Sequence, residues 1–133
     1  MSMLDAFLTP ANEMQTIEVE MPRFKDAEGK PAKIILRNIT SEQNTIIQAR
    51  CLKKKKVNGV EMDTIDQALY LDNLILEMII EPNFRDKRFV EHMGKASPID
   101  ALKARFNIGE YNKIVEAVNK LIGAYDLVKQ SKN

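Results

Sequence analysis

The stretch NIGEYNKIVEAVNKLIG, residues 107–123, decides the fold because it spells out one complete amphipathic helix. Glu110 near its start and Lys120 in its last turn both suit the helix dipole, and Gly123 suits a helix end. Apolar side chains recur at helical spacing and form an apolar stripe that predicts a partner surface: Tyr111, Ile114, Val115, Val118, Leu121, Ile122 and Tyr125. We expect most of this stripe to be core, and any exposed part of it, from Tyr111 to Tyr125, to be a candidate binding surface.

Length and composition set the broad class of the protein. A chain of 133 residues predicts one domain, and 44% hydrophobic with 29% charged residues is ordinary for a soluble globular protein. The single Cys51 excludes an intramolecular disulfide and fits a reducing cytosol. The sequence shows no signal-peptide pattern and no apolar run of the roughly 18 residues that span a membrane. We therefore expect a cytoplasmic protein without a membrane partner.

The region before residue 40 predicts an N-terminal arm followed by a β-hairpin. In the arm, residues 1–15, Met3, Leu4, Phe7 and Leu8 share one helical face before Pro10, and the arm is either a frayed terminus or a docking segment. Alternation of apolar and polar residues over 16–24, and a second β-favouring run over 33–39, predict two paired strands. A lone hairpin is marginal in water, so its apolar face must pack on helices or further strands.

The middle of the chain predicts two helices separated by a turn. Thr40 and Gln43 have capping-box spacing, and the helix that they start is expected to continue to about Lys55. The Asn58-Gly59 pair marks a turn. From Asp63 as N-cap, a largely apolar segment predicts the longest helix, which lies in the middle of the domain and ends near Ile80, before Pro82.

The remaining segments complete the expected architecture. A short basic helix is predicted over 86–93, and Ser97-Pro98 is typical of an N-cap with proline at the first helical position. The fold class is therefore α+β and mostly helical, with an N-terminal β-hairpin packed on about five helices. We expect one globular domain over 16–125, between a flexible arm, 1–15, and a loose tail, 126–133.

The lysine run is the most conspicuous local feature of the sequence. It comprises Lys53, Lys54, Lys55 and Lys56, and it lies in a segment, 33–62, with seven basic and two acidic residues. Three interpretations stay open: a solvated helix C-terminus, a contact for an acidic protein surface, or a nucleic-acid contact. No aromatic side chains alternate with the lysines, which weakens the interpretation as a site for single-stranded nucleic acid.

Residues that carry chemistry are sparse in this chain. It has one histidine, His92, and one cysteine, whereas a zinc site needs several ligands and a catalytic histidine needs a nucleophile or an orienting acid. Asp63 with Asp66, and Glu77 with Glu81, are better explained as helix-terminal and solvated side chains than as acid–base pairs. All five glycines fall at predicted turns or helix ends, so no phosphate-binding loop is indicated. We expect no catalytic, cofactor or metal site and no enzymatic activity.

The order of these segments resembles the phage tail assembly chaperones, in particular the XkdN-like family of phages and prophages of Gram-positive bacteria. The resemblance covers about residues 16–125 and rests on short motifs whose order and spacing match: KIILR (33–37) followed by Thr40-Ser41-Glu42, CLKKKK (51–56), IIEPNF (79–84), IGEY (108–111) and LIG (121–123). It implies a non-enzymatic chaperone that binds the tape measure protein and helps recruit tail tube subunits. It also implies action in the host cytoplasm, absence from the mature virion and, for many relatives, a longer form made by frameshifting.

Candidate partner-binding residues follow from pattern alone, because the resemblance transfers no defined site. They lie in the arm, the lysine run and the apolar stripe: Leu4, Phe7, Leu8, Lys53, Lys54, Lys55, Lys56, Tyr111 and Tyr125. Self-association is a further possibility for such surfaces. The alternative function is a small nucleic-acid-associated regulator that uses the basic region 50–56.

Overall fold

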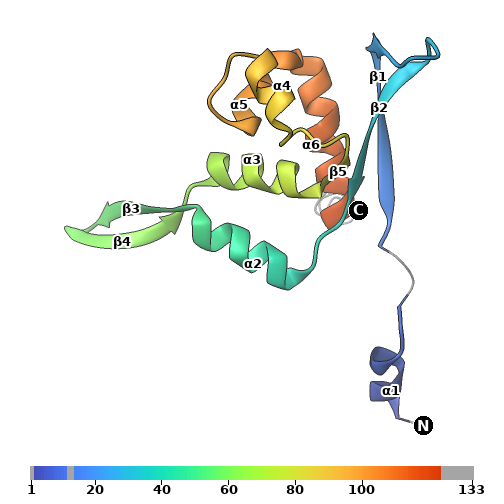
Figure 1. The fold of residues 1–133 in the computed structure, drawn as a ribbon. Coiled ribbons are helices and arrows are strands. Elements are labelled where there is room, and N and C mark those ends of the chain that lie inside the picture. The colour runs from blue at the N-terminus through green and yellow to red at the C-terminus, as the bar shows by residue number, and fades with distance from the viewer. Residues whose placement is uncertain (1, 12–13, 124–133) are drawn as a thin grey trace, which may run out of the picture.

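The computed structural model describes residues 2–11 and 14–123, which contain both helices and strands (Figure 1). The helices are α1 Met3–Leu8, α2 Ser41–Arg50, α3 Gln67–Met78, α4 Lys87–His92, α5 Pro98–Arg105 and α6 Ile108–Ile122. The strands are β1 Thr16–Lys25, β2 Pro31–Arg37, β3 Leu52–Val57, β4 Val60–Ile65 and β5 Ile79–Glu81. Helices account for 48% and strands for 27% of these residues, so the fold is α+β, whereas the expectation of a mostly helical chain is not confirmed.

The main sheet has three antiparallel strands in the order β1-β2-β5. The predicted N-terminal hairpin forms its first two strands, with Val19 opposite Ile34 and Ile17 opposite Leu36. Helices α2 to α6 lie on one side of this sheet (Figure 1). Because successive side chains of a strand point to opposite faces, the apolar set of both strands faces the helices.

The core lies between the sheet and the helices. Its buried side chains come from β1, β2 and every helix from α2 to α6 except α4: Val19, Met21, Ile34, Leu36, Ile47, Leu74, Ile75, Met78, Ala101, Leu102, Ile114, Ala117, Val118 and Leu121. Helix α6 supplies four of them, of which Ile114, Val118 and Leu121 belong to the predicted apolar stripe. Tyr111 and Val115 of the stripe are partly buried and pack against this core. Most of the described stripe is therefore core.

The helix boundaries near α6 agree with the sequence signals. The Asn107 side chain accepts the Glu110 backbone N–H at the start of α6, and Gly123 ends the helix with a left-handed φ of 81°. Ser97 accepts the Asp100 N–H ahead of Pro98 in α5. Asp86 caps α4 through the Arg88 N–H. The predicted tail, 126–133, and Tyr125 lie outside the described residues.

The prediction of one helix from Thr40 to about Lys55 is wrong beyond residue 50. Thr40 and Gln43 do form the capping box, but α2 ends at Arg50 and the lysine run forms strand β3. Lysine itself is a good helix former. Asn58 and Gly59, with φ of 52° and 80°, instead make a two-residue turn that joins β3 to β4 in a second hairpin. Such a turn directs the two flanking runs into antiparallel pairing, which here overrides the helix propensity.

The expected boundaries of the central helix also need correction. Asp66, not Asp63, is the N-cap of α3, and its side chain accepts the Leu69 N–H at 3.1 Å. Asp63 lies in β4 instead. The helix ends at Met78, because the next three residues, Ile79–Glu81, pair with β2 as strand β5. Helix α3 has 12 residues, and α6, with 15, is the longest helix of the described chain.

Candidate functional site

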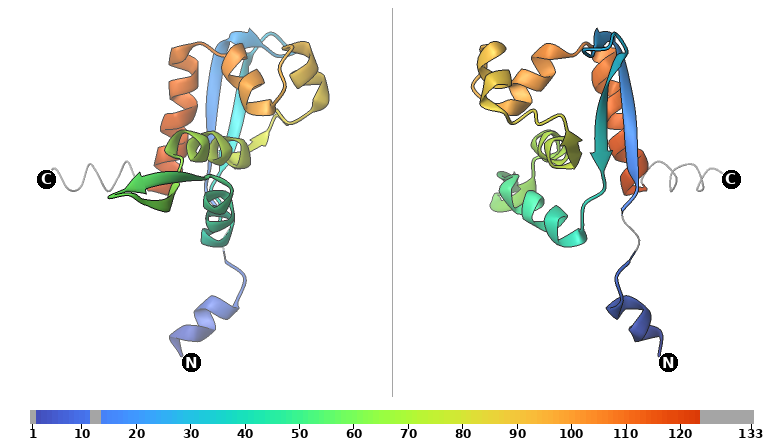
Figure 2. Two further views of the ribbon diagram at one scale, coloured as in Figure 1. Left: turned by 90° about the vertical axis from the view of Figure 1, so that its left-hand side faces the viewer. Right: turned by 45° about the vertical axis from the view of Figure 1, so that its right-hand side comes forward.

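The β3–β4 hairpin projects from the domain, as two views of the ribbon show (Figures 1 and 2). Every residue of β3 is exposed, and so are the first four residues of β4. The hairpin is anchored only at its base, where the Asp66 N–H donates to the Cys51 carbonyl at 2.7 Å and Leu52 pairs with Ile65. The segment that carries the lysine run therefore contributes little to the core and is available for contact.

Strand pairing divides the four lysines between the two faces of the hairpin. Directly opposed residues of an antiparallel pair lie on the same face. On the paired face, Lys54 makes an ion pair with Asp63 at 2.7 Å, and Lys56 lies opposite Glu61. The other face, called the open face below, carries Lys53, Lys55, Val57, Val60, Met62 and Thr64.

The open face combines uncompensated positive charge with exposed apolar side chains. Lys53 lies opposite Thr64 and Lys55 opposite Met62, so the pairing places no acidic residue across from either lysine. Val60 and Met62 keep 61% and 52% of their surface exposed, so large apolar side chains lie on the same face as the two lysines. An acidic, partly apolar partner segment would complement this face.

The N-terminal arm is a second exposed apolar element. Helix α1 extends from the domain on the far side of a linker (Figure 2). Its large apolar side chains are strongly exposed: Met3 78%, Leu4 64%, Phe7 79% and Leu8 71%. Asp5 stabilises the first turn by accepting the Ser2 backbone N–H at 3.0 Å. The face predicted from the sequence thus exists and packs on none of the described core residues.

Tyr111 occupies a different environment from the arm and the hairpin. It is half-buried, and its hydroxyl donates to the Asp72 carboxylate of α3 at 3.2 Å. Burial first, and then the neighbouring Asp72, raise the pKa of Tyr111 to about 12. Lys103 of α5 binds the same carboxylate at 2.9 Å. Tyr111 therefore connects three helices, and the structure brings it together with neither the lysine run nor the arm.

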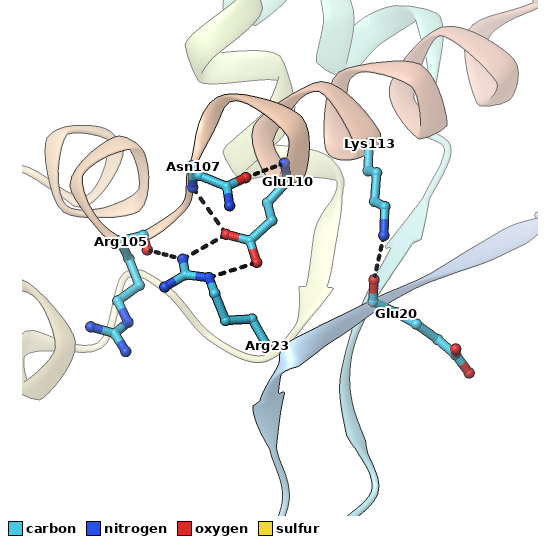
Figure 3. Close-up of polar contacts among 6 residues, drawn as sticks. All are labelled: Glu20, Arg23, Arg105, Asn107, Glu110 and Lys113. Carbon is cyan, nitrogen blue, oxygen red and sulfur yellow. Dashed lines mark hydrogen bonds and ion pairs between the residues drawn. The ribbon is translucent and has the colours of Figure 1, made fainter.

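A polar cluster fixes strand β1 to the start of helix α6 (Figure 3). Glu110 is the one buried charged residue of the described chain, and Arg23 donates to both of its carboxylate oxygens, at 2.7 and 3.1 Å. The Asn107 backbone N–H donates to the same carboxylate at 3.0 Å, and Arg23 also donates to the Arg105 carbonyl. Nothing in the sequence pattern links Arg23 to Glu110, because 87 positions separate them.

This cluster is structural rather than catalytic in its arrangement. The hydrogen bonds from Arg23, and then the one from Asn107, hold the pKa of the Glu110 carboxyl below its ordinary value. Both oxygens are engaged by these donors, so neither is directed at a substrate pocket. Nearby, Lys113 donates to the Glu20 backbone carbonyl of β1 at 3.4 Å (Figure 3).

Replacing Glu110 by glutamine is expected to make stability less sensitive to acid. A lowered folded-state pKa means that the charged carboxylate stabilises the fold above about pH 4.3, the ordinary pKa of glutamate, and that this stabilisation is lost as the pH falls through the folded-state pKa. The Glu110→Gln variant should therefore be less stable than the parent at pH 7, and the difference should shrink towards pH 3. Urea unfolding across this range measures it.

Glu116→Gln is the matched control. Glu116 lies on the same helix, but it is exposed, and its ion pair with Lys120 is long, at 3.9 Å. This variant should follow the parent at every pH, since exposed pairs contribute little. A stability difference for Glu110→Gln that stays constant from pH 7 to pH 3 would contradict a role for its charge.

The groups considered for chemistry are dispersed in the structure. Cys51 is fully buried, and burial raises the pKa of its thiol, which disfavours the reactive thiolate. His92 is exposed at the end of α4. Within residues 2–11 and 14–123, no three His, Cys, Asp or Glu side chains gather as metal ligands, and no helix is long and apolar enough to cross a membrane.

Comparison with known proteins identifies the class to which this fold belongs. The family model described as phage XkdN-like tail assembly chaperone protein matches residues 4–131. The crystal structure of the protein YqbN, a Northeast Structural Genomics Consortium target, superposes with a TM-score of 0.67 and covers 89% of this chain and 94% of its own. Its sequence identity of 21% shows a shared fold. No curated protein matches the chain in sequence.

The family model places the chain among phage tail assembly factors. The chain belongs to the XkdN-like family of phage tail assembly chaperones, because the family model spans nearly its whole length. The match begins at residue 4 and so includes most of the arm, which the resemblance seen in the sequence left out.

Proposed function

We propose that this chain is a non-enzymatic chaperone that binds the tape measure protein of its phage and helps recruit tail tube subunits around it. Its family supports a role in tail assembly. The observation that carries the proposal is the β3–β4 hairpin, which projects from a closed core and exposes large apolar side chains beside lysines. A chaperone needs such adaptable contact surface and no reactive pocket.

The expected chemistry of the tape measure protein, the proposed client of this chaperone, fits these surfaces. A tape measure protein is expected to be a long, aggregation-prone helical chain, and its amphipathic segments would present apolar stripes with charged margins. Val60 and Met62 on the open face would cover apolar side chains, while Lys53 and Lys55 would pair with acidic margins. The exposed face of α1 would provide a second apolar contact.

Co-expression with the tape measure protein tests the proposal. We expect the soluble fraction of the tape measure protein to rise several-fold with this chain and to co-purify with it. Tail tube protein added to the complex should then be retained. A tape measure protein that is equally insoluble with and without this chain would rule the proposal out.

The same preparation separates the chaperone from the alternative regulator. Nucleic-acid binding through phosphate contacts weakens steeply with salt. Tight, salt-sensitive binding of DNA or RNA that is lost when Lys53–Lys56 are changed would favour the regulator. We further propose that the protein acts in the host cytoplasm and leaves the assembled tail, so immunoblots should detect it in lysates and not in purified virions.

Deleting residues 1–13 is expected to weaken capture of the tape measure protein while leaving the melting temperature nearly unchanged. None of the described residues of this segment is buried, so its removal exposes no core. Thermal unfolding followed by circular dichroism measures stability, and co-purification measures capture. A large loss of stability would show that the arm belongs to the core.

A further inference from the structure

The open face of the β3–β4 hairpin exposes apolar side chains that a binding partner would bury. A two-stranded hairpin is marginally stable in water by itself, and this one is held to the domain only at its base. Its paired face is stabilised by the Lys54–Asp63 ion pair. The open face gains no comparable contact and leaves Val57, Val60 and Met62 between 42% and 61% exposed.

The N-terminal arm has the complementary composition. The arm, residues 1–15, contains Asp5 and Glu13 and no lysine or arginine. Helix α1 adds a continuous apolar face made by Met3, Leu4, Phe7 and Leu8. One chain therefore carries an exposed acidic and apolar element as well as an exposed basic and apolar one.

We propose that the arm of one copy binds the open face of the hairpin of a second copy. The apolar face of α1 covers Val60 and Met62, and the acidic charge of the arm, including Asp5, neutralises Lys53 and Lys55. In the single chain, arm and hairpin leave the domain in different directions (Figures 1 and 2), which favours a contact between copies. This self-association uses the same surfaces as the proposed binding of the tape measure protein, and it is tested in the absence of that protein.

Reciprocal exchange of arms closes the assembly as a dimer. A six-residue helix on one hairpin face makes a smaller contact than the roughly 1,000 Å² of a specific interface. When the arm of each copy binds the hairpin of the other, the same contact is made twice around a two-fold axis. The exposed apolar surface of both elements is then covered until a client competes for it.

The test uses the purified full-length chain without any tail protein, with mass measured by sedimentation velocity. The parent should exceed its monomer mass of 15.2 kDa. A Lys53→Thr, Lys55→Thr variant should dissociate with a dissociation constant raised at least about tenfold, since two close charge pairs are lost. Lys54→Thr, Lys56→Thr is the matched control: it removes the same charge from the same strand but from the paired face, and it should associate like the parent.

Mixing two defective variants tests whether the contact is made between copies. The chain lacking residues 1–13 keeps a hairpin, and the Lys53→Thr, Lys55→Thr variant keeps an arm. Each should be monomeric alone, and the mixture should form a heterodimer through the one intact contact, more weakly than the parent. A mixture that shows no association even well above the parent's dissociation constant, a parent that is monomeric at every concentration, or equal effects of the two lysine pairs would each overturn the proposal. Solubility of co-expressed tape measure protein is scored separately, so the two proposals fail independently.

Discussion

Replacing residues 53–64 by Asn-Gly is expected to abolish the proposed solubilising effect on the tape measure protein while leaving the domain folded. The new turn would join Leu52 directly to Ile65, which already face each other at the base of the hairpin. The Asp66 N–H to Cys51 carbonyl hydrogen bond of 2.7 Å holds these ends together. None of the removed residues is buried, so the core loses no packing. The excised segment contains the whole lysine run and most of the exposed apolar surface of the hairpin.

Two measurements decide this prediction. The soluble fraction of co-expressed tape measure protein should fall to the level found without any chaperone, and the melting temperature should stay within about 5 °C of the parent, as for a change confined to the surface. The Lys54→Thr, Lys56→Thr variant controls for loss of charge, and it should retain most of the effect. A shortened chain that still solubilises the client fully would show that capture uses another surface.

Replacing Ile114 by alanine is expected to cost about 2–5 kcal/mol of unfolding free energy, the usual range for emptying a core site. Ile114 is fully buried in the core cluster, on the helix that packs against both the sheet and α3. A domain of this size has a total stability of only about 5–15 kcal/mol. The variant should therefore unfold at clearly lower denaturant concentration than the parent.

Ile108→Ala on the same helix is the matched control. Ile108 keeps 81% of its surface exposed, so the same chemical change there should alter stability by less than about 0.5 kcal/mol. Urea unfolding at neutral pH compares the two variants with the parent. Equal losses at the two positions would contradict the assignment of the apolar stripe to the core.

Local signals predicted much of the fold. The capping residues of α5 and α6 and the two strands of the first hairpin were readable from sequence, because each depends on neighbours within a few positions. The order of the motifs was enough to recognise the family, which the family model confirms. Helix α6 is the clearest example of such local signals, because the spacing of its apolar residues and the residues at its start and end all indicate one helix.

The parts that were missed depend on pairing between distant or ambiguous segments. The lysine run suits a helix by propensity, and only its partner strand across Asn58-Gly59 makes it β3. Strand β5 continues directly from a helical pattern, and its pairing with β2 has no local marker. The Arg23–Glu110 pair likewise joins residues 87 positions apart.

The sequence identified candidate binding residues, but it did not predict the structure around all of them. The exposed face of α1 lies where the sequence placed it, whereas the basic run was expected in a helix and forms strand β3 instead. Both remain proposed contacts. The division of the run into Lys54 and Lys56 on one face and Lys53 and Lys55 on the other follows from strand register, which the sequence alone did not specify.

The Lys113–Glu20 contact affects how readily the edge of the main sheet can pair with another chain. Strand β1 is an edge of the main sheet and is long enough to template another strand. Lys113 occupies the Glu20 carbonyl, and Pro22 has no N–H to offer, so this edge presents an interrupted ladder. An interrupted ladder makes β1 a poor template for a strand from another copy, and this opposes the growth of fibres along that edge.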